Sequence, residues 1–168
     1  MRFLLFSLVV FLFHGAFSQS PYDNSTFDDR LATIILQKDL TIYDPLPIIA
    51  LGSNEKLILS FDHFSPQNEF YNYTFIHCNS KWEPSSMQQM EYINGNPMGE
   101  ITEFKFSTNT YQNYTHYSLK FPTEQMKITK SGNYILKVFR NFDEEDIVLT
   151  RRFMVLDQNT KISATVRS

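Results

Sequence analysis

The sequence YTHYSLKF, residues 114–121, decides the fold because polar and apolar side chains alternate in it from His116 to Phe121. In an extended chain Tyr117, Leu119 and Phe121 lie on one face, and the polar residues between them lie on the other. Alternation with a period of two is typical of a β-strand that packs one face on a core and exposes the other to water. Residues 114–121 are therefore predicted to form a half-buried strand.

Similar runs recur along the chain and are separated by turn residues. Further strands are expected in the runs 32–37, 56–61, 71–78, 101–106, 133–139, 147–156 and 161–167. Short strands at this spacing are typical of a sandwich or barrel. In one run Tyr134 stands two positions before Leu136, as at the start of strand F in immunoglobulin-like domains. We therefore predict an all-β, immunoglobulin-like β-sandwich of about seven to eight strands.

The N-terminus has the layout of a secretory signal peptide. Arg2 provides a positive start, residues 3–13 are apolar and uncharged, and the small residues Ala16 and Ser18 precede Gln19 at the positions that signal peptidase requires. The apolar run is shorter than the roughly 20 residues needed to span a bilayer. Residues 1–18 are predicted to be a signal peptide cleaved before Gln19, so the chain is expected to be exported without inserting into a membrane.

The remaining chain divides into a short lead-in and one domain. Residues 19–30 are polar and rich in Asp, Asn and Ser, which predicts a flexible lead-in. Residues 31–168 have the length of a single domain. The net charge of −3 argues against a nucleic-acid partner, which would need a basic surface, and against attraction to anionic lipid.

Cys78 is the only cysteine in the 168 residues, so no intrachain disulfide can form. It lies in an apolar strand without a neighbouring base or cation in the sequence. A reactive cysteine needs such a neighbour to stabilise its thiolate. Cys78 is therefore predicted to be a small buried hydrophobic residue rather than a reactive thiol.

The sequence contains no recognisable catalytic or metal-binding motif. His63, His77 and His116 lie in three different segments, whereas a zinc site needs three or four ligands that converge. His77 and Cys78 are adjacent on a strand, so their side chains point to opposite faces and cannot form a catalytic pair. The acidic run 143–146 lacks the spacing of a calcium loop and is interpreted as a solvated hairpin tip. No enzyme activity, cofactor or metal is predicted.

Four residues are candidates for contact with a partner. Trp82 and Glu83 lie in the long non-periodic stretch 79–100, and long connections without structure are often functional. A tryptophan in a loop is either a lid over the core or an exposed binding anchor. Arg151 and Arg152 are consecutive in a strand, so one projects to each face, where it either forms a structural ion pair or contacts a partner. We predict these four residues to be partner-binding.

Several ordered strings resemble the plug protein family of the Bacteroidota type IX secretion system. They are FIHCNSKW at 75–82, YTHY at 114–117, SGNY at 131–134, LTRRFMV at 149–155 and LILSFD at 57–62. The resemblance covers nearly all of the chain after the predicted signal peptide. Several strings that match in the same order identify a family more specifically than a single string does.

The resemblance implies a periplasmic protein with an immunoglobulin-like N-terminal domain and a binding role instead of catalysis. Its expected partner is the outer-membrane translocon barrel, whose periplasmic opening the plug binds and closes. Members of this family are longer, so residues 31–168 are expected to correspond to the N-terminal domain, without the family's C-terminal part. The alternative function is that of a secreted carbohydrate-binding or adhesion module.

Overall fold

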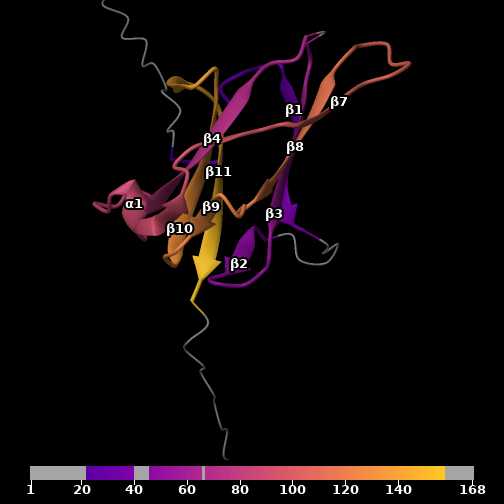
Figure 1. Cartoon of the computed structure of the whole chain (residues 1–168). Helices are drawn as coiled ribbons and strands as arrows, with labels where there is room; N and C mark the ends of the chain where they lie inside the picture. The colour runs from indigo at the N-terminus through magenta and orange to yellow at the C-terminus, as the bar shows by residue number, and fades with distance from the viewer. Residues whose placement is uncertain (1–21, 40–45, 66, 158–168) are drawn as a thin grey trace, which may run out of the picture.

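The computed structural model describes residues 22–39, 46–65 and 67–157, and their regular secondary structure is almost entirely β-strand (Figure 1). The strands are β1 (Leu31–Lys38), β2 (Ile48–Ala50), β3 (Leu57–His63), β4 (Tyr71–Cys78), β5 (Ile93–Gly95), β6 (Gly99–Glu100), β7 (Glu103–Phe106), β8 (Thr115–Phe121), β9 (Met126–Ile128), β10 (Gly132–Arg140) and β11 (Asp143–Leu156). The helix α1 (Gln89–Tyr92) is a single turn. The predicted all-β class is confirmed.

The strands form two large sheets that face one another (Figure 1). One sheet has the order β1-β3-β8-β7, and the other has the order β2-β11-β10-β4-β6. Within these sheets, β2 runs parallel to β11, and the other neighbouring strands are antiparallel. Strands β5 and β9 form a small separate pair.

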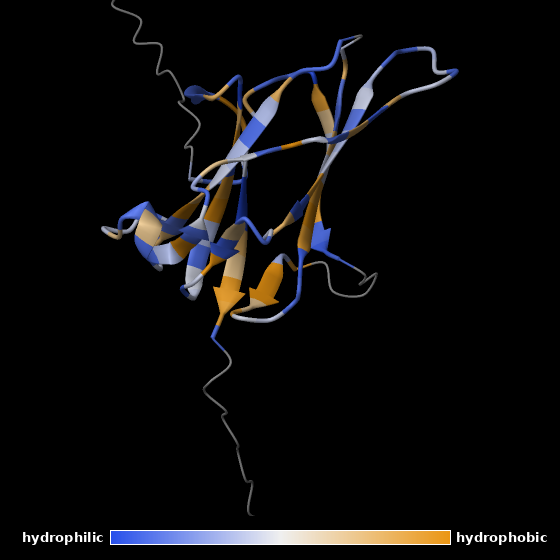
Figure 2. Cartoon of the chain, viewed as in Figure 1, coloured by the Kyte–Doolittle hydropathy of each residue, from blue (hydrophilic) through white to orange (hydrophobic). Residues whose placement is uncertain are grey.

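Aromatic side chains fill the space between the two sheets. Phe121 on β8 has its ring centroid 5.3 Å from that of Phe75 on β4 and 5.2 Å from that of Phe153 on β11. Tyr117 and Leu119 are buried on the same face of β8, as the alternation of residues 114–121 predicts. Figure 2 shows apolar residues along the strands of both sheets and polar residues over most of the loops. Burial of these large rings is the main stabilising contribution to such a core.

Tyr134 closes one corner of the sandwich. Its ring is fully buried and stacks on Phe153 with a centroid distance of 5.3 Å. Its hydroxyl donates a hydrogen bond of 2.8 Å to the carbonyl oxygen of Lys130, four residues upstream. This backbone bond is the arrangement described for the tyrosine at the start of strand F.

Several short elements do not follow from the sequence pattern. The stretch 79–100, interpreted as lacking periodic structure, contains α1, β5 and β6, so that interpretation is wrong in part. Strands β2, β5, β6 and β9 have only two or three residues each, too few to show an alternation. These short strands are defined by hydrogen bonds to partner strands that lie elsewhere in the chain.

The acidic run is not a hairpin tip. Residues 143–146 begin β11, and the tip between β10 and β11 is formed by Asn141 and Phe142, both with positive φ. Arg140 holds the start of β11, since it donates to both carboxylate oxygens of Asp146 at 2.8 Å. Ion pairs between β10 and β11 therefore extend the pairing of these two strands through residues 143–146, which the sequence suggests are solvated.

The outer edge of β11 is paired with the segment before β1. The backbone N–H of Phe27 donates to the carbonyl oxygen of Val148 at 2.9 Å, and that of Thr150 donates to Ser25 at the same distance. These residues belong to the predicted lead-in, of which the structure describes residue 22 onward. The predicted signal peptide and the predicted strand at 161–167 lie outside the described residues. Within the described ranges, no helix is long and apolar enough to cross a membrane.

Candidate functional site

The turn after β4 places Trp82 against β11, which belongs to the same sheet as β4. The side-chain oxygen of Asn79 accepts hydrogen bonds from the backbone N–H groups of Lys81 at 2.8 Å and Glu83 at 3.1 Å. Within this turn Trp82 has φ of 66°, in the left-handed region. The guanidinium of Arg152 lies 4.6 Å from the ring centroid of Trp82, which is a cation–π contact. The structure thus brings together two of the four residues predicted to bind a partner.

Arg152 also holds the segment before β1. Its Nε and Nη2 donate to the carbonyl oxygen of Tyr22 at 3.0 and 2.7 Å, and its Nη1 lies 3.3 Å from the carboxylate of Asp23. One side chain therefore joins β11, the Trp82 turn and residues 22–23.

Arg151 and Glu83 are placed differently. Arg151 donates to the carbonyl oxygen of Ser25 at 2.8 Å and to the hydroxyl of Thr26 at 3.2 Å. Burial lowers the pKa of Arg151 from its ordinary value. Glu83 is exposed beside Trp82, and its carboxylate accepts a hydrogen bond of 2.9 Å from the side-chain amide of Asn79. The pattern of arginine contacts shows that both guanidinium groups bind residues 22–26.

Cys78 is buried, as the sequence predicts, with 3% of its surface exposed. Burial raises the pKa of its thiol to about 11. A thiol that stays protonated at neutral pH is a poor nucleophile.

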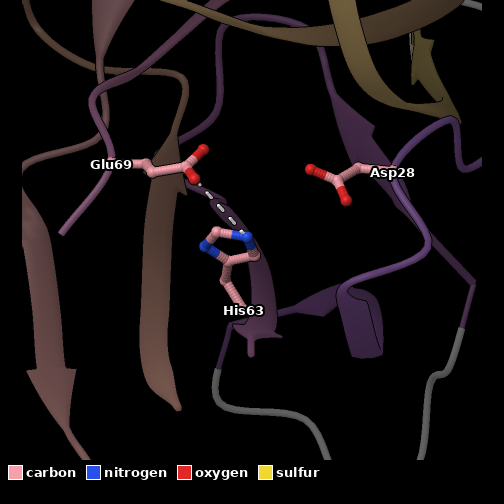
Figure 3. Close-up of side chains that lie close together, drawn as sticks. All are labelled: Asp28, His63 and Glu69. Carbon is pink, nitrogen blue, oxygen red and sulfur yellow. Dashed lines mark ion pairs between the residues drawn. The ribbon is translucent and has the colours of Figure 1, made fainter. Parts of the chain in front are cut away.

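A cluster that the sequence does not predict lies at the start of β4. Asp28, His63 and Glu69 come from three segments, and one potential ligand atom from each lies within 4.8 Å of the others (Figure 3). His63 is fully buried, and neither ring nitrogen has a hydrogen-bond partner among the described residues. The neighbouring Asp62 points away and binds Nδ1 of His116 at 2.6 Å. An imidazole with two carboxylates is a set of ligands that divalent metals accept.

Two arginines already bind these carboxylates. Arg30 donates to both oxygens of Asp28 at 3.0 and 2.7 Å and to Glu69 at 3.1 Å. Arg140 donates to Asp28 at 2.7 Å and lies 3.5 Å from Glu69. The Arg30 guanidinium holds the pKa of Asp28 well below its usual range. Since a divalent cation would have to displace two guanidinium groups, we interpret the cluster as a structural ion-pair network that joins the segment before β1 to β3, β4 and β10.

An open groove lined by phenylalanines lies beside this network. We call it the Phe142 groove; it has a volume of about 320 Å³, and its lining includes Phe70, Phe104, Phe142, Glu69 and Glu100. The exposed fractions are 71% for Phe70 and 62% for Phe142. Nothing in the alternation pattern predicts this groove, because its walls come from separate connections between strands.

The groove and the Trp82 turn occupy opposite ends of β4. The groove includes Tyr71, the first residue of β4, whereas Trp82 follows Cys78, the last residue. The eight residues of β4 span roughly 25 Å in an extended strand. The two surfaces are therefore separate.

The sequence matches one protein family over most of the chain. The family described as "Type 9 secretion system plug protein 1st domain" matches residues 31–157, which include every strand of both large sheets. No curated protein matches the sequence.

Two solved structures resemble this chain to very different degrees. A crystal structure of a hypothetical protein from Parabacteroides merdae ATCC 43184 has a TM-score of 0.77 and 27% sequence identity, over 83% of this chain and 35% of that chain. The present chain thus spans about a third of the length of that protein. The Pseudomonas fluorescens alkylpurine DNA glycosylase AlkC, bound to DNA containing an abasic site analog, has a TM-score of 0.40 and 11% identity, over 75% of this chain and 30% of that chain. A likeness at this level carries no structural argument.

Proposed function

This chain belongs to the type 9 secretion system plug family, and on that premise we propose that it binds the periplasmic opening of the outer-membrane translocon barrel and closes it. The observation that carries the proposal is the match to the plug family's first domain over residues 31–157. That range contains the sandwich from β1 to β11. The family is a secretion-system family and not an enzyme family, which favours a binding role.

We propose further that the sandwich is immunoglobulin-like. The order β1-β3-β8-β7 corresponds to strands A-B-E-D, and β11-β10-β4 corresponds to G-F-C. The hydrogen bond from Tyr134 to Lys130 supports the assignment of β10 as strand F. Export to the periplasm, with cleavage before Gln19, completes the proposal.

The proposed contact with the barrel includes Trp82, Glu83, Arg151 and Arg152. Trp and Arg are enriched among residues that dominate binding energy at interfaces. The stack of Arg152 on Trp82 holds the aromatic ring in one orientation, which lowers the entropy lost when a partner binds. The exposed carboxylate of Glu83 lies beside it for a polar contact at the rim. Arg151 contributes through the segment 22–26 that it holds.

The test is co-purification of the tagged protein from outer-membrane extracts of its own host. We expect the barrel to be recovered with the wild type. The amount of barrel recovered should fall at least tenfold with Trp82→Ala or Glu83→Lys. Tyr111→Ala is the matched control, because Tyr111 is a fully exposed aromatic residue in the loop between β7 and β8. Circular dichroism verifies that each variant is folded.

The possible outcomes test the proposed function and the proposed contact residues separately. Recovery of the barrel with every variant would keep the proposed function and remove Trp82 and Glu83 from the proposed contact. Absence of the barrel while export is idle would contradict closure of the pore. Retention of the protein on a glycan array in that case would favour the carbohydrate-binding alternative.

A further inference from the structure

We propose that the Phe142 groove and the free edge of β7 bind an extended segment of a partner protein, with apolar side chains at alternate positions and an adjacent lysine or arginine. The segment would add to the sheet as a strand next to β7. This site lies at the opposite end of β4 from the Trp82 turn. The proposal therefore holds independently of whether the chain closes the translocon.

Among the residues that the structure describes, no strand pairs with the outer edge of β7. Strand β7 is the last strand of its sheet, and all four of its residues are exposed. The backbone N–H of Ser107 donates to the carbonyl oxygen of Tyr114. Because such bonds alternate along an antiparallel pair, the backbone groups of Phe104 and Phe106 point away from β8. An exposed edge with apolar side chains is a template for another strand unless it is covered.

The side chains of β7 continue the groove along that edge. The ring of Phe104 lies 6.0 Å from the buried Tyr117 and 5.5 Å from Phe106, measured between centroids. Phe104 and Phe106 therefore share the face that points toward the core, and Phe106 is 57% exposed. A strand paired with β7 would place every second side chain on this face, beside the two rings. Apolar residues at alternate positions of the partner would cover them.

Phe142 has a backbone conformation that favours glycine or asparagine. It follows Asn141 in the two-residue tip between β10 and β11, with φ of 52° for Asn141 and 62° for Phe142. A tip with positive φ at both positions usually carries Asn-Gly. A bulky side chain is strained in that conformation, and the ring of Phe142 is mostly exposed instead of packed in the core. Strain of this kind at an exposed aromatic residue points to a binding role.

The charge of the groove selects a basic segment. Its charged lining residues, Glu69 and Glu100, are both acidic. Glu69 is paired with Arg30 and Arg140, but among the described residues Glu100 has no ion pair and is exposed. A lysine or arginine of the partner can therefore pair with Glu100 at the groove's margin. Glu103 and Lys105 alternate with the phenylalanines and so point to the other face of β7.

The experiment is selection of binders from a phage-displayed library of random linear peptides on the full chain. The expected peptides carry apolar residues at alternate positions with a lysine or arginine next to them. A synthetic copy of the best peptide should lose at least tenfold in affinity for Phe142→Gly and for Glu100→Lys. Tyr111→Ser should bind it as the wild type does. Phe142→Gly suits this test because glycine accepts the positive φ, so the variant is expected to fold.

A second measurement reports the binding mode. In nuclear magnetic resonance spectra, the peptide should slow hydrogen exchange at the amides of Phe104 and Phe106. Failure to enrich peptides, enrichment of acidic or helix-spaced peptides, or binding unaffected by Phe142→Gly and Glu100→Lys would each overturn the proposal. Self-association of the chain that Phe106→Ser abolishes would replace the partner segment with a second copy of the chain.

Discussion

The guanidinium of Arg152 lies over the ring of Trp82, with 4.6 Å between its central carbon and the ring centroid. The contact connects the turn after β4 to β11, and six further strands, β5 to β10, lie between them in the sequence. Arg152 also binds the carbonyl oxygen of Tyr22, so three separate segments depend on one side chain.

We expect Arg152→Ala to loosen this junction. The variant loses a cation–π contact and two hydrogen bonds to Tyr22, which together contribute about 1–2 kcal/mol to stability. Trp82 is the only tryptophan, so the tryptophan fluorescence of the protein comes from this residue alone. The emission of Trp82 should shift toward the value of solvated indole. Arg152→Lys, which keeps the charge, should shift it less, and an emission unchanged in both variants would contradict the contact.

His63 should make stability fall as the solution is acidified from neutral pH. Burial lowers the pKa of His63 from 6.5 in the folded chain, against an opposing effect of Glu69. The unfolded chain therefore binds more protons, and stability is lost as pH falls below about 6.5. Arg30 and Arg140 lower the same pKa, whereas Asp28 raises it. Urea unfolding between about pH 7.5 and pH 5.5 should show this slope in the wild type.

The variant His63→Leu should remove most of that slope while keeping an apolar group in the site. The carboxyl of Asp28, whose pKa is strongly lowered, contributes stability that is lost only at much lower pH. The two effects therefore occupy different pH windows. An equal slope in His63→Leu and the wild type would rule out His63 as its source.

Replacement of Asp28 by alanine should be strongly destabilising. Asp28 is buried and accepts hydrogen bonds from Arg30 and Arg140. Removing one partner of a buried ion pair leaves the other charges poorly compensated, at a cost of about 3 kcal/mol. Lys127→Ala is the control, because its pair with Glu124 is solvent-exposed and should not contribute measurably. Comparable urea midpoints for the two variants would contradict the structural role of the network.

Phe142→Gly should leave the free energy of unfolding unchanged or raise it by up to about 1 kcal/mol, because glycine removes the strain of a positive φ. This gain is partly offset by the greater freedom of glycine in the unfolded chain. Thermal unfolding followed by circular dichroism measures it. A marked loss of stability would show that the ring of Phe142 serves the core, in conflict with its exposure.

Two glycines with positive φ allow a matched comparison of the small β5–β9 sheet. A Cβ added at Gly95 would overlap the backbone carbonyl of Gln125, whereas one added at Gly52 meets no atom within 4 Å. Both substitutions to alanine carry the cost of the backbone conformation, about 1 kcal/mol. Gly95→Ala carries the steric overlap in addition, so its melting temperature should be clearly lower. Equal melting temperatures would mean that β5 is not held against β9.

The longer strands could be predicted because their signal is local. The alternation in residues 114–121 and 71–78 depends only on neighbouring residues, and both runs form strands with nearly the predicted bounds. The prediction for residues 143–146 was wrong because the ion pairs that extend β11 join residues on two different strands. Strands of two or three residues show no period at all, so β6 and β9 become visible only when their partners are in place.

By itself the sequence determined the all-β class, the main strands, the tyrosine at the corner and the burial of Cys78, since each depends on the order of side chains along one strand. It also named Trp82 and Arg152 separately, without indicating that they touch. Only the tertiary structure decided that contact, the Asp28–His63–Glu69 network and the Phe142 groove. These features join residues far apart in the chain, and their positions depend on how the two sheets pack and how their strands are ordered.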